Sequence, residues 1–216
     1  RSKCVIPLSS NTFIHYHYKY ILIMAKLHFF YSTMNAGKST SLLQSNHNYL
    51  ENNLETLLFL PKENISFNEG KIVSRIGIDA KAIEVNSRFN FYDYVNTVEH
   101  KNLSCILIDE SQFLSKKQVG QLGSIADNLN IPVMCYGIRT DFRGELFEGS
   151  AALLAIADNL IELKTVCSEC SRKATMVVRL NEDGVVQVSG EQVQLGGNDI
   201  YKVVCRKHFQ ELTNLL

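Results

Sequence analysis

Short apolar runs alternate with segments of helical periodicity along most of this chain. Apolar runs that are typical of buried strands cover residues 26–31, 56–60, 103–108, 133–136 and 160–163. Helical patterns lie between them, at residues 38–50, 91–100, 116–129 and 151–157. Strands that alternate with helices in this way favour a parallel sheet with crossover helices. The pattern therefore predicts an α/β fold with a parallel central sheet.

Two longer stretches are predicted to be mobile. Residues 63–77 are polar and contain glycine, and such a loop beside a ligand site could close over a bound molecule. Residues 189–199 carry Gly190, Gly196 and Gly197, which would let the backbone approach a flat ligand closely. Both loops are therefore candidates for contact with a substrate.

The loop after the first predicted strand has the sequence of a phosphate-binding P-loop. It reads Ser32-Thr33-Met34-Asn35-Ala36-Gly37-Lys38-Ser39, and a helical pattern follows at once. Backbone N–H groups at a helix N-terminus lack intrahelical partners and can bind phosphate oxygens. Lys38 would reach the β- and γ-phosphates, and the Ser39 hydroxyl would hold Mg²⁺. Ser32 stands where the general pattern has its first glycine, and the Gly-Lys-Ser sequence alone could also be an ordinary helix start.

A second nucleotide signal follows the apolar run at residues 103–108. Asp109 and Glu110 come directly after this predicted strand, and open parallel sheets bind ligands at the carboxyl ends of their strands. Asp109 is placed to hold the shell of a magnesium ion, whereas Glu110 could accept a proton from a hydroxyl group or orient water. The alternative is a solvated turn before the next helix, whose start is marked by a capping box of Ser115 and Gln118.

The C-terminal part of the chain holds two pairs of candidate metal ligands. Cys167 and Cys170 form a C-x-x-C motif, and Cys205 and His208 form a C-x-x-H motif. Two close pairs on either side of a longer loop are typical of a structural zinc site, in which four protein ligands leave no open position. A redox C-x-x-C motif beside an unrelated cysteine and histidine is the alternative.

Composition limits the class of protein further. The chain has 216 residues, 45% of them hydrophobic, which suits one α/β core and a small appended unit. Its 22 basic and 22 acidic residues balance, which argues against a dedicated nucleic-acid binder, and no apolar run approaches the length of a membrane span. The other cysteines are Cys4, Cys105 and Cys135. They do not form a disulfide framework, which favours a reducing, cytoplasmic location, and Cys105 and Cys135 are expected to be buried.

Together these motifs resemble the type II thymidine kinases, and most closely their bacterial branch. The resemblance begins at Met24 and rests on the metal pairs and four segments: Met34-Asn35-Ala36-Gly37-Lys38-Ser39-Thr40, Asp109-Glu110-Ser111-Gln112-Phe113, Tyr136-Gly137-Ile138-Arg139-Thr140-Asp141-Phe142-Arg143-Gly144 and Gly196-Gly197-Asn198-Asp199-Ile200-Tyr201. It implies a P-loop NTPase core at residues 24–163 and a zinc-ribbon-like domain at residues 164–216, whose loop covers the nucleoside. Residues 1–23 have no counterpart, and we expect them to be a non-native or disordered extension.

The resemblance also implies an activity: transfer of the γ-phosphoryl group of ATP to the 5′-hydroxyl of thymidine, and also of deoxyuridine. Glu110 matches the family's proton acceptor, and Ser39 and Asp109 match its magnesium ligands. Positions that match ATP-binding residues are Ser32, Thr33, Met34, Asn35, Ala36, Gly37, Lys38, Ser39, Asp109, Glu110, Ser111 and Gln112. Positions that match the nucleoside pocket are Met34, Phe113, Phe142, Gln194, Leu195, Gly196, Gly197 and Tyr201. Members of the family are homotetramers that dTTP inhibits.

Several assignments stay open at this stage. Phe113 and Phe142 could instead be core residues. Arg75 and Arg143 could either stabilise the transferring phosphoryl group or form surface salt bridges. A P-loop motor stimulated by nucleic acid would use the same two acids to activate water, although the chain is short for two motor cores. A zinc-ribbon binding module would carry the P-loop without turnover.

Overall fold

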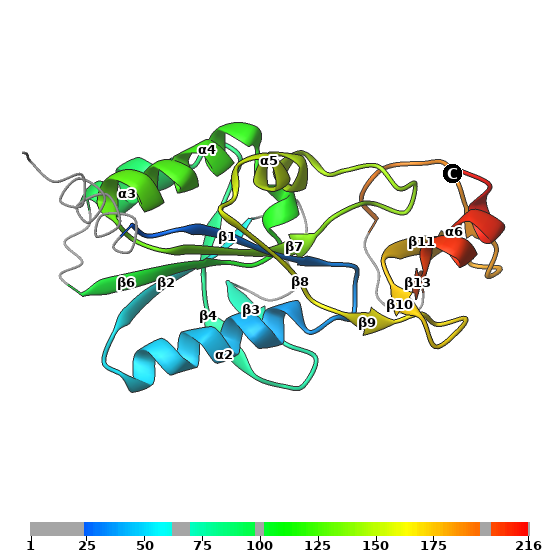
Figure 1. Ribbon diagram of the computed structural model, residues 1–216, viewed down its shortest axis with the longest axis horizontal. Helices are drawn as coiled ribbons and strands as arrows, with labels where there is room; N and C mark the ends of the chain where they lie inside the picture. Colours follow the sequence, from blue (N-terminus) through cyan, green and yellow to red (C-terminus); the bar gives the residue numbers. More distant parts are fainter. Residues whose placement is uncertain (1–23, 62–69, 98–101, 195–199, 216) are drawn as a thin grey trace, which may run out of the picture.

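The computed structural model describes residues 24–61, 70–97, 102–194 and 200–215, and its centre is a six-stranded sheet (Figure 1). The strands of this sheet are β1 (Leu27–Ser32), β2 (Glu55–Pro61), β5 (Ile83–Val85), β6 (Leu103–Ile108), β7 (Val133–Ile138) and β8 (Asn159–Glu162). They lie in the order β5-β2-β6-β7-β1-β8, and every neighbouring pair is parallel. The predicted parallel α/β sheet is therefore confirmed, with β5 as a strand that the sequence pattern did not reveal.

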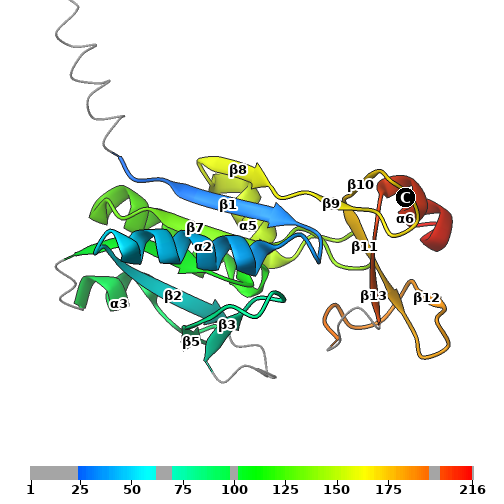
Figure 2. The same ribbon diagram turned by 90° about the horizontal axis from the view of Figure 1, so that it is seen from below.

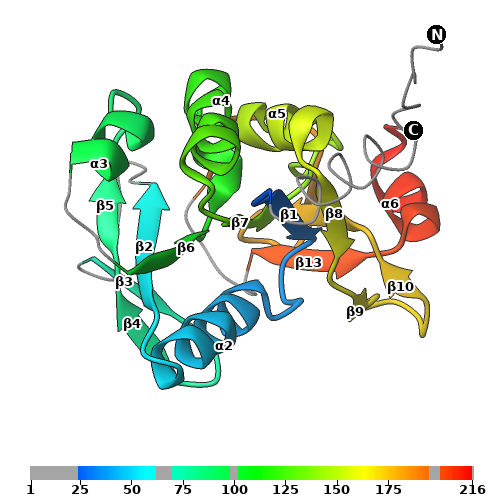
Figure 3. The ribbon, with the colours of Figure 1, turned by 60° about the vertical axis from the view of Figure 1, so that its left-hand side comes forward.

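Helices cover both faces of this sheet (Figure 3). One face carries a long helix and a two-stranded hairpin: α2 (Lys38–Glu51), β3 (Lys71–Val73) and β4 (Asp79–Lys81). The other face carries three helices: α3 (Phe91–Thr97), α4 (Lys116–Ser124) and α5 (Glu148–Ile156). Two hydrophobic clusters fill the two interfaces, so the sheet is the middle layer of three.

The central strand β6 shows why the strands read as continuous apolar runs. Cys105 and Leu107 pack in the cluster with α2, whereas Ile106 and Ile108 pack in the cluster with α3, α4 and α5. All four side chains are fully buried, because a strand with helices on both sides has no position that faces water. Each buried leucine or isoleucine stabilises the fold by roughly 1.5–3 kcal/mol. The predicted burial of Cys105 and Cys135 is confirmed.

α4 begins as predicted and ends differently. The Ser115 hydroxyl accepts from the backbone N–H of Gln118, and the Gln118 side chain accepts from the backbone N–H of Ser115, which confirms the capping box. The α-helix predicted to reach residue 129 ends at Ser124, however, and Ile125–Leu129 continues as a π-helical turn. Apolar periodicity marks the buried face of a helix, but it does not distinguish a terminal π-turn from an α-turn.

Helices α3 and α5 also differ from their predicted bounds. α3 is helical up to Thr97, and residues 98–100 of the predicted helix lie outside the described residues. α5 begins at Glu148, earlier than the predicted start at residue 151. Its first turn contains Gly149 and Ser150, which are buried but carry no apolar signal that a periodicity search would detect.

The stretch at residues 63–77, which the sequence predicts to be mobile, contains a strand in the part that the structure describes. Residues 63–69 lie outside the described residues, but Lys71–Val73 pairs with Asp79–Lys81 as an antiparallel hairpin. Strands of three residues are too short to show a clear alternation of polar and apolar positions. The sequence pattern therefore missed an element that packs beside α2.

A smaller unit lies beyond the carboxyl ends of β1 and β8 (Figures 1 and 2). Its elements are β9 (Thr165–Val166), β10 (Lys173–Ala174), β11 (Met176–Leu180), β12 (Val186–Gln187), β13 (Tyr201–Val204) and α6 (Arg206–Thr213). β12, β11 and β13 form an antiparallel sheet with β11 at its centre. This unit has its own apolar cluster, with Val178, Val204 and Phe209 fully buried. The predicted appended unit is thus present.

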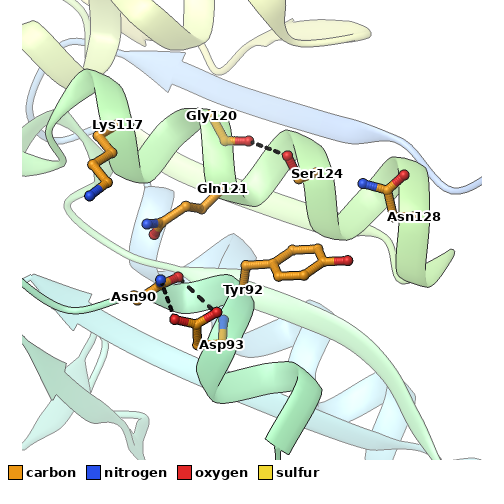
Figure 4. Close-up of a pocket in the computed structure, with 8 residues that line it drawn as sticks. All are labelled: Asn90, Tyr92, Asp93, Lys117, Gly120, Gln121, Ser124 and Asn128. Atoms are coloured by element: carbon orange, nitrogen blue, oxygen red, sulfur yellow. Dashed lines mark hydrogen bonds between the residues drawn. The ribbon is translucent and has the colours of Figure 1, made fainter.

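A shallow polar groove of about 490 Å³ runs between α3 and α4 (Figure 4). It is lined by Asn90, Tyr92, Asp93, Lys117, Gly120, Gln121, Ser124 and Asn128. The P-loop helix α2 covers the opposite face of the sheet, so this groove is separate from the P-loop. Within the described residues, no helix has the length and apolar character that crossing a membrane requires.

Candidate nucleotide site and metal-ligand cluster

The P-loop connects β1 to α2 at the carboxyl end of the sheet. Ser32 ends β1, and its buried hydroxyl donates to the carbonyl oxygen of Thr33 at 2.6 Å. The turn itself uses left-handed backbone at Asn35 (φ 61°) and Gly37 (φ 73°), whereas Ser32 does not have a positive φ. Glycine is therefore not required at Ser32, which explains how the chain accommodates this departure from the general P-loop pattern.

α2 starts without a side-chain cap. Gly37 is its N-cap residue, and no side-chain oxygen accepts from the first N–H groups of the helix at this cap. Those N–H groups lie at the positive end of the helix dipole and face the loop. A phosphate group bound in the loop would supply the missing acceptors.

Lys38 is the buried cation of this loop. It is 8% exposed, and its Nζ donates to the carbonyl oxygen of Thr33 at 2.8 Å. Burial lowers the pKa of Lys38, and the negative charges of Glu110 and Asp109 raise it in part. The positive charge of Arg75 lowers the pKa of Lys38 further. An arriving phosphate would place further negative charge beside this buried ammonium group.

Asp109 meets the P-loop although β7 lies between β1 and β6. The Ser39 hydroxyl donates to Asp109 Oδ2 at 2.7 Å. Asp109 is 4% exposed, and burial together with the charge of Glu110 raises its pKa to about 7, against the opposing effect of the Ser39 hydrogen bond. A hydroxyl and a carboxylate are the oxygen ligands that Mg²⁺ prefers, and its charge would favour the ionised carboxylate. The Ser39–Asp109 pair therefore fits the predicted magnesium site.

Glu110 has a backbone conformation that is uncommon for glutamate. Its φ of 47° and ψ of 38° place it in the left-handed region, and such outliers concentrate at functional sites. Its side chain is held by buried Gln112, whose Nε2 donates to Glu110 Oε2 at 2.5 Å. Gln112 Oε1 in turn accepts from the backbone N–H of Ile138 at 3.1 Å. The β7 backbone thus decides which end of the Gln112 amide faces the Glu110 carboxylate.

The residues predicted for a nucleoside pocket are brought together in part. Met34 is half-buried and packs against the core of the C-terminal unit. The Tyr201 hydroxyl donates to the carbonyl oxygen of Gln194 at 2.9 Å. Three predicted positions lie outside the described residues, namely Leu195, Gly196 and Gly197.

The two candidate phenylalanines occupy different environments. Phe113 is half-buried and meets Phe147 edge to face, with 5.8 Å between the ring centroids. Phe142 is 1% exposed, and the guanidinium carbon of Arg179 lies 3.7 Å from its ring centroid. Phe142 therefore has the burial of a core residue, as one of the two sequence interpretations expected, and Arg179 covers one face of its ring.

The two candidate arginines also differ. Arg143 Nη2 lies 2.8 Å from a carboxylate oxygen of Asp141 and 2.8 Å from one of Glu145, and the Arg143 side chain is 28% exposed. Of the two interpretations for Arg143, the structure shows the salt bridge. The positive charge of Arg75 lowers the pKa of Lys38, so Arg75 acts electrostatically on the P-loop lysine.

The four predicted metal ligands converge in the C-terminal unit. The ligand atoms of Cys167, Cys170, Cys205 and His208 all lie within 4.8 Å of one another. His208 Nδ1 lies 3.4 Å from Cys167 Sγ and 3.5 Å from Cys205 Sγ, and the Sγ atoms of Cys170 and Cys205 are 4.0 Å apart. Metal–ligand bonds of about 2.0–2.3 Å at tetrahedral angles separate the ligands by about 3.3–3.8 Å. The cluster could therefore hold a tetrahedral metal ion.

The surroundings of this cluster favour metal ligation. Burial raises the pKa of the Cys167 thiol, but contacts with His208 and with neighbouring backbone N–H groups outweigh it and lower the pKa to about 6. A thiolate rather than a thiol is the ligand that a metal requires. His208 Nε2 lies 3.8 Å from a carboxylate oxygen of Glu211, and such a carboxylate orients the ring of a ligating histidine.

The P-loop touches the C-terminal unit directly, which the sequence motifs did not reveal. The Thr33 hydroxyl donates to the carbonyl oxygen of Met176 in β11 at 3.2 Å. Arg139, which follows β7, donates from Nη2 to the carbonyl oxygen of Thr175 at 3.4 Å. These contacts join residues that are far apart in the sequence, so no local motif could indicate them. The P-loop and the C-terminal unit are therefore in direct contact.

The fold and this site define a P-loop nucleotide-binding protein: a parallel sheet carries the P-loop and an acidic pair at one edge, and a unit with a metal-ligand cluster is attached there. Comparison with known families narrows the class. The family model described as thymidine kinase matches residues 25–209, and the chain belongs to the thymidine kinase family.

Curated relatives agree with this family. A thymidine kinase of Shewanella oneidensis is 55% identical over 189 residues, which cover 87% of this chain and 98% of that protein. A thymidine kinase of Mannheimia succiniciproducens is 55% identical over 194 residues, which cover 89% of this chain and 99% of that protein. A solved structure of the Pif1 helicase from Candida albicans covers 74% of this chain and 40% of that chain, at 18% identity and a TM-score of 0.37, too low to carry an argument.

Proposed function

We propose that this protein transfers the γ-phosphoryl group of ATP to the 5′-hydroxyl of thymidine, and of deoxyuridine, and releases the monophosphate and ADP. The observation that carries the proposal is the position of Glu110, a constrained carboxylate beside the P-loop in a chain 55% identical to curated thymidine kinases. A kinase that phosphorylates a hydroxyl group can use such a carboxylate to accept the proton.

Each side chain of the nucleotide site has a role in this proposal. The P-loop backbone and the N-terminus of α2 bind the phosphates, and Lys38 offsets the charge that spreads over the transferring group. Ser39 and Asp109 would hold Mg²⁺, which when bound would neutralise part of the charge on the phosphates. Glu110 accepts the proton of the 5′-hydroxyl as its oxygen attacks, and Gln112 keeps the Glu110 carboxylate in place.

The C-terminal unit is proposed to cover the nucleoside. We divide the chain into a nucleotide-binding domain at residues 24–163 and a zinc-binding domain at residues 164–216, because each part has its own apolar cluster. The cysteine–histidine cluster is proposed to bind structural Zn²⁺, which suits its sulfur and nitrogen ligands. The proposed nucleoside contacts come from both domains: Met34, Phe113, Phe142, Gln194, Leu195, Gly196, Gly197 and Tyr201.

The resemblance to the family also supports proposals about assembly, regulation and location. We propose a homotetramer that dTTP inhibits, as expected for the type II branch. We propose a cytoplasmic location as well, because the five described cysteines are free thiols and suit a reducing compartment. The equal numbers of acidic and basic residues give no support to a nucleic-acid partner.

A panel of acceptors tests the proposed function. ADP formation from ATP and Mg²⁺ is measured with thymidine, deoxyuridine, deoxycytidine, deoxyadenosine and single-stranded DNA. We expect stimulation by thymidine and deoxyuridine and none by DNA. A single methyl group in an apolar pocket contributes about 1–3 kcal/mol, so thymidine should be favoured over deoxyuridine by about 10- to 200-fold at most. ADP release that responds to DNA and not to nucleosides would contradict the proposal.

A further inference from the structure

Arg179 is a buried cation in β11, the central strand of the C-terminal sheet. It is 2% exposed, and within the described parts of the chain none of the ion pairs includes it. A buried charge is costly unless hydrogen bonds or other polar groups compensate it. The contacts that Arg179 does make should therefore explain why it is there.

Those contacts hold the chain segment that follows β11 in one shape. Arg179 Nε donates to the side-chain oxygen of Gln187 at 2.7 Å. Nη1 donates to the carbonyl oxygen of Glu191 at 2.8 Å, and Nη2 donates to the carbonyl oxygen of Ser189 at 3.4 Å. A guanidinium group presents several N–H donors in a rigid fork, so three oxygens that converge on it are fixed relative to one another.

The same guanidinium connects this segment to the other domain. Its carbon lies 3.7 Å from the ring centroid of Phe142, which is the distance of a cation–π contact. The neighbouring residue Asp141 accepts a hydrogen bond from Gln192 Nε2 at 3.2 Å. The segment around residues 187–192 is thus joined at two points to the turn after β7.

The sheet register places further holding groups beside Arg179. Gln187 of β12 and Tyr201 of β13 are its cross-strand partners, so the three side chains lie on one face of the sheet. The Tyr201 hydroxyl donates to the carbonyl oxygen of Gln194 at 2.9 Å. One face of the sheet therefore anchors the backbone of residues 187–194 at several points.

Gly190 allows the backbone to pass this close to the guanidinium. Its φ is +126°, and a Cβ atom built there would lie 2.6 Å from Arg179 Nη2. An alanine at this position would have to displace either the loop or the arginine. Gly184 of the same unit also has a positive φ, +76°, but a Cβ atom there would meet no atom within 4 Å. Gly184 therefore offers a control position that has a positive φ but no clash.

We propose that Arg179 is a positioning residue for nucleoside binding. Its side chain holds residues 187–194 in the shape of a preformed cover and fixes the ring of Phe142. The inference rests on the proposed function, which assigns Phe142, Gln194 and Tyr201 to the nucleoside subsite. A loop that is already ordered loses less conformational entropy when the nucleoside binds. Arg179 acts through the loop and the ring and does not itself contact the reacting groups.

The first test compares arginine variants of the full-length, metal-loaded protein. Arg179→Met removes the charge and the donors but keeps the length of the side chain. We expect its KM for thymidine to rise about 10- to 100-fold, while KM for ATP changes less than about threefold and bound metal stays at the wild-type level. Arg179→Lys keeps the positive charge but loses the planar set of N–H donors. Its KM for thymidine should therefore lie between those of wild type and Arg179→Met. Arg172→Met, at an exposed arginine of the same unit, should behave as wild type.

The second test leaves Arg179 intact and disturbs its neighbour. Gly190→Ala should raise KM for thymidine as Arg179→Met does, because the added methyl group displaces the loop from the guanidinium. Gly184→Ala also places a side chain at a positive φ, one close to the left-handed region, but without a clash, and should leave KM for thymidine near the wild-type value. This pair of glycine variants tests whether the contact between Arg179 and the loop affects thymidine binding, even if Arg179→Met does not fold.

Amide hydrogen exchange of the peptide covering residues 187–194 provides a readout that needs no catalysis. We expect faster exchange there in Arg179→Met and Gly190→Ala, with unchanged exchange in β1 and α2. Unchanged KM for thymidine and unchanged exchange would overturn the inference. An equal rise in both KM values with loss of metal would also overturn it, because Arg179 would then only stabilise the fold. If ADP formation by the wild-type protein did not respond to thymidine, the proposed function would be refuted. The exchange data would still show whether Arg179 anchors the loop.

Discussion

Glu110→Gln is expected to lower kcat for thymidine phosphorylation by about 10²- to 10⁴-fold while ATP binding stays within a few-fold of wild type. The amide keeps the size of the side chain and can still accept a hydrogen bond from Gln112, so the end of β6 keeps its shape. It cannot accept the proton of the attacking hydroxyl group. Steady-state kcat, together with a binding titration of a non-hydrolysable ATP analogue, measures both parts of this prediction.

Two further variants control the glutamate prediction. Glu110→Asp keeps a carboxylate but withdraws it by one methylene group, so its kcat should lie between those of wild type and Glu110→Gln. Glu51→Gln makes the same chemical change at the exposed end of α2 and should leave kcat unchanged. Wild-type kcat in Glu110→Gln would remove Glu110 from the role of proton acceptor.

Loss of the metal is expected to weaken nucleoside binding strongly, which is the second large effect that we predict. In Cys205→Ser we expect bound metal to fall from about one ion per chain to almost none, and KM for thymidine to rise by at least about 100-fold. Metal binding in small structural sites contributes about 10–16 kcal/mol of apparent folding free energy, and this unit has only a small apolar cluster of its own. ATP affinity should weaken less, through loss of the contact between Thr33 and Met176. Elemental analysis and KM values for both substrates measure these effects.

A cysteine outside the cluster serves as the control for this change. Cys135→Ala removes a buried thiol from the central sheet and should leave the metal content unchanged, although it lowers thermal stability. Wild-type protein that is stripped by a chelator and resupplied with zinc should recover its KM for thymidine. A Cys205→Ser variant without metal that keeps the wild-type KM would contradict the proposed link between the metal and the nucleoside cover.

The parts of this site that were predictable from the sequence depend on local spacing. A P-loop, an acidic pair after a buried strand, and two pairs of metal ligands each need particular residue types at short, fixed distances along the chain. The parallel fold brings Ser39 and Asp109 into hydrogen-bond contact, because the carboxyl ends of parallel strands meet at one edge of the sheet. Local chemistry plus a regular fold was therefore sufficient to predict that Ser39 lies beside Asp109 and that the four candidate metal ligands come together.

Other features depend on long-range packing and had no sequence signature. The amide of Gln112 is oriented by the backbone of β7. The hydrogen bonds of Arg179 are made to oxygens that only the folded loop brings together. The Thr33–Met176 contact likewise exists only after the C-terminal unit packs against the P-loop. The sequence pattern did not reveal the three-residue strands β3 and β5, because so short a segment has no measurable period.

The central claim, that the γ-phosphoryl group of ATP reaches the 5′-hydroxyl of thymidine, is tested most directly by identifying the phosphorylated product. Thymidine and 5′-deoxythymidine are compared as acceptors, with ³¹P NMR of the product and ADP formation measured together. We predict one 5′-monophosphate for each ADP with thymidine, and ADP formation no faster than without nucleoside when the 5′-hydroxyl is missing. A 3′-monophosphate, or equal ADP formation with both acceptors, would contradict the account.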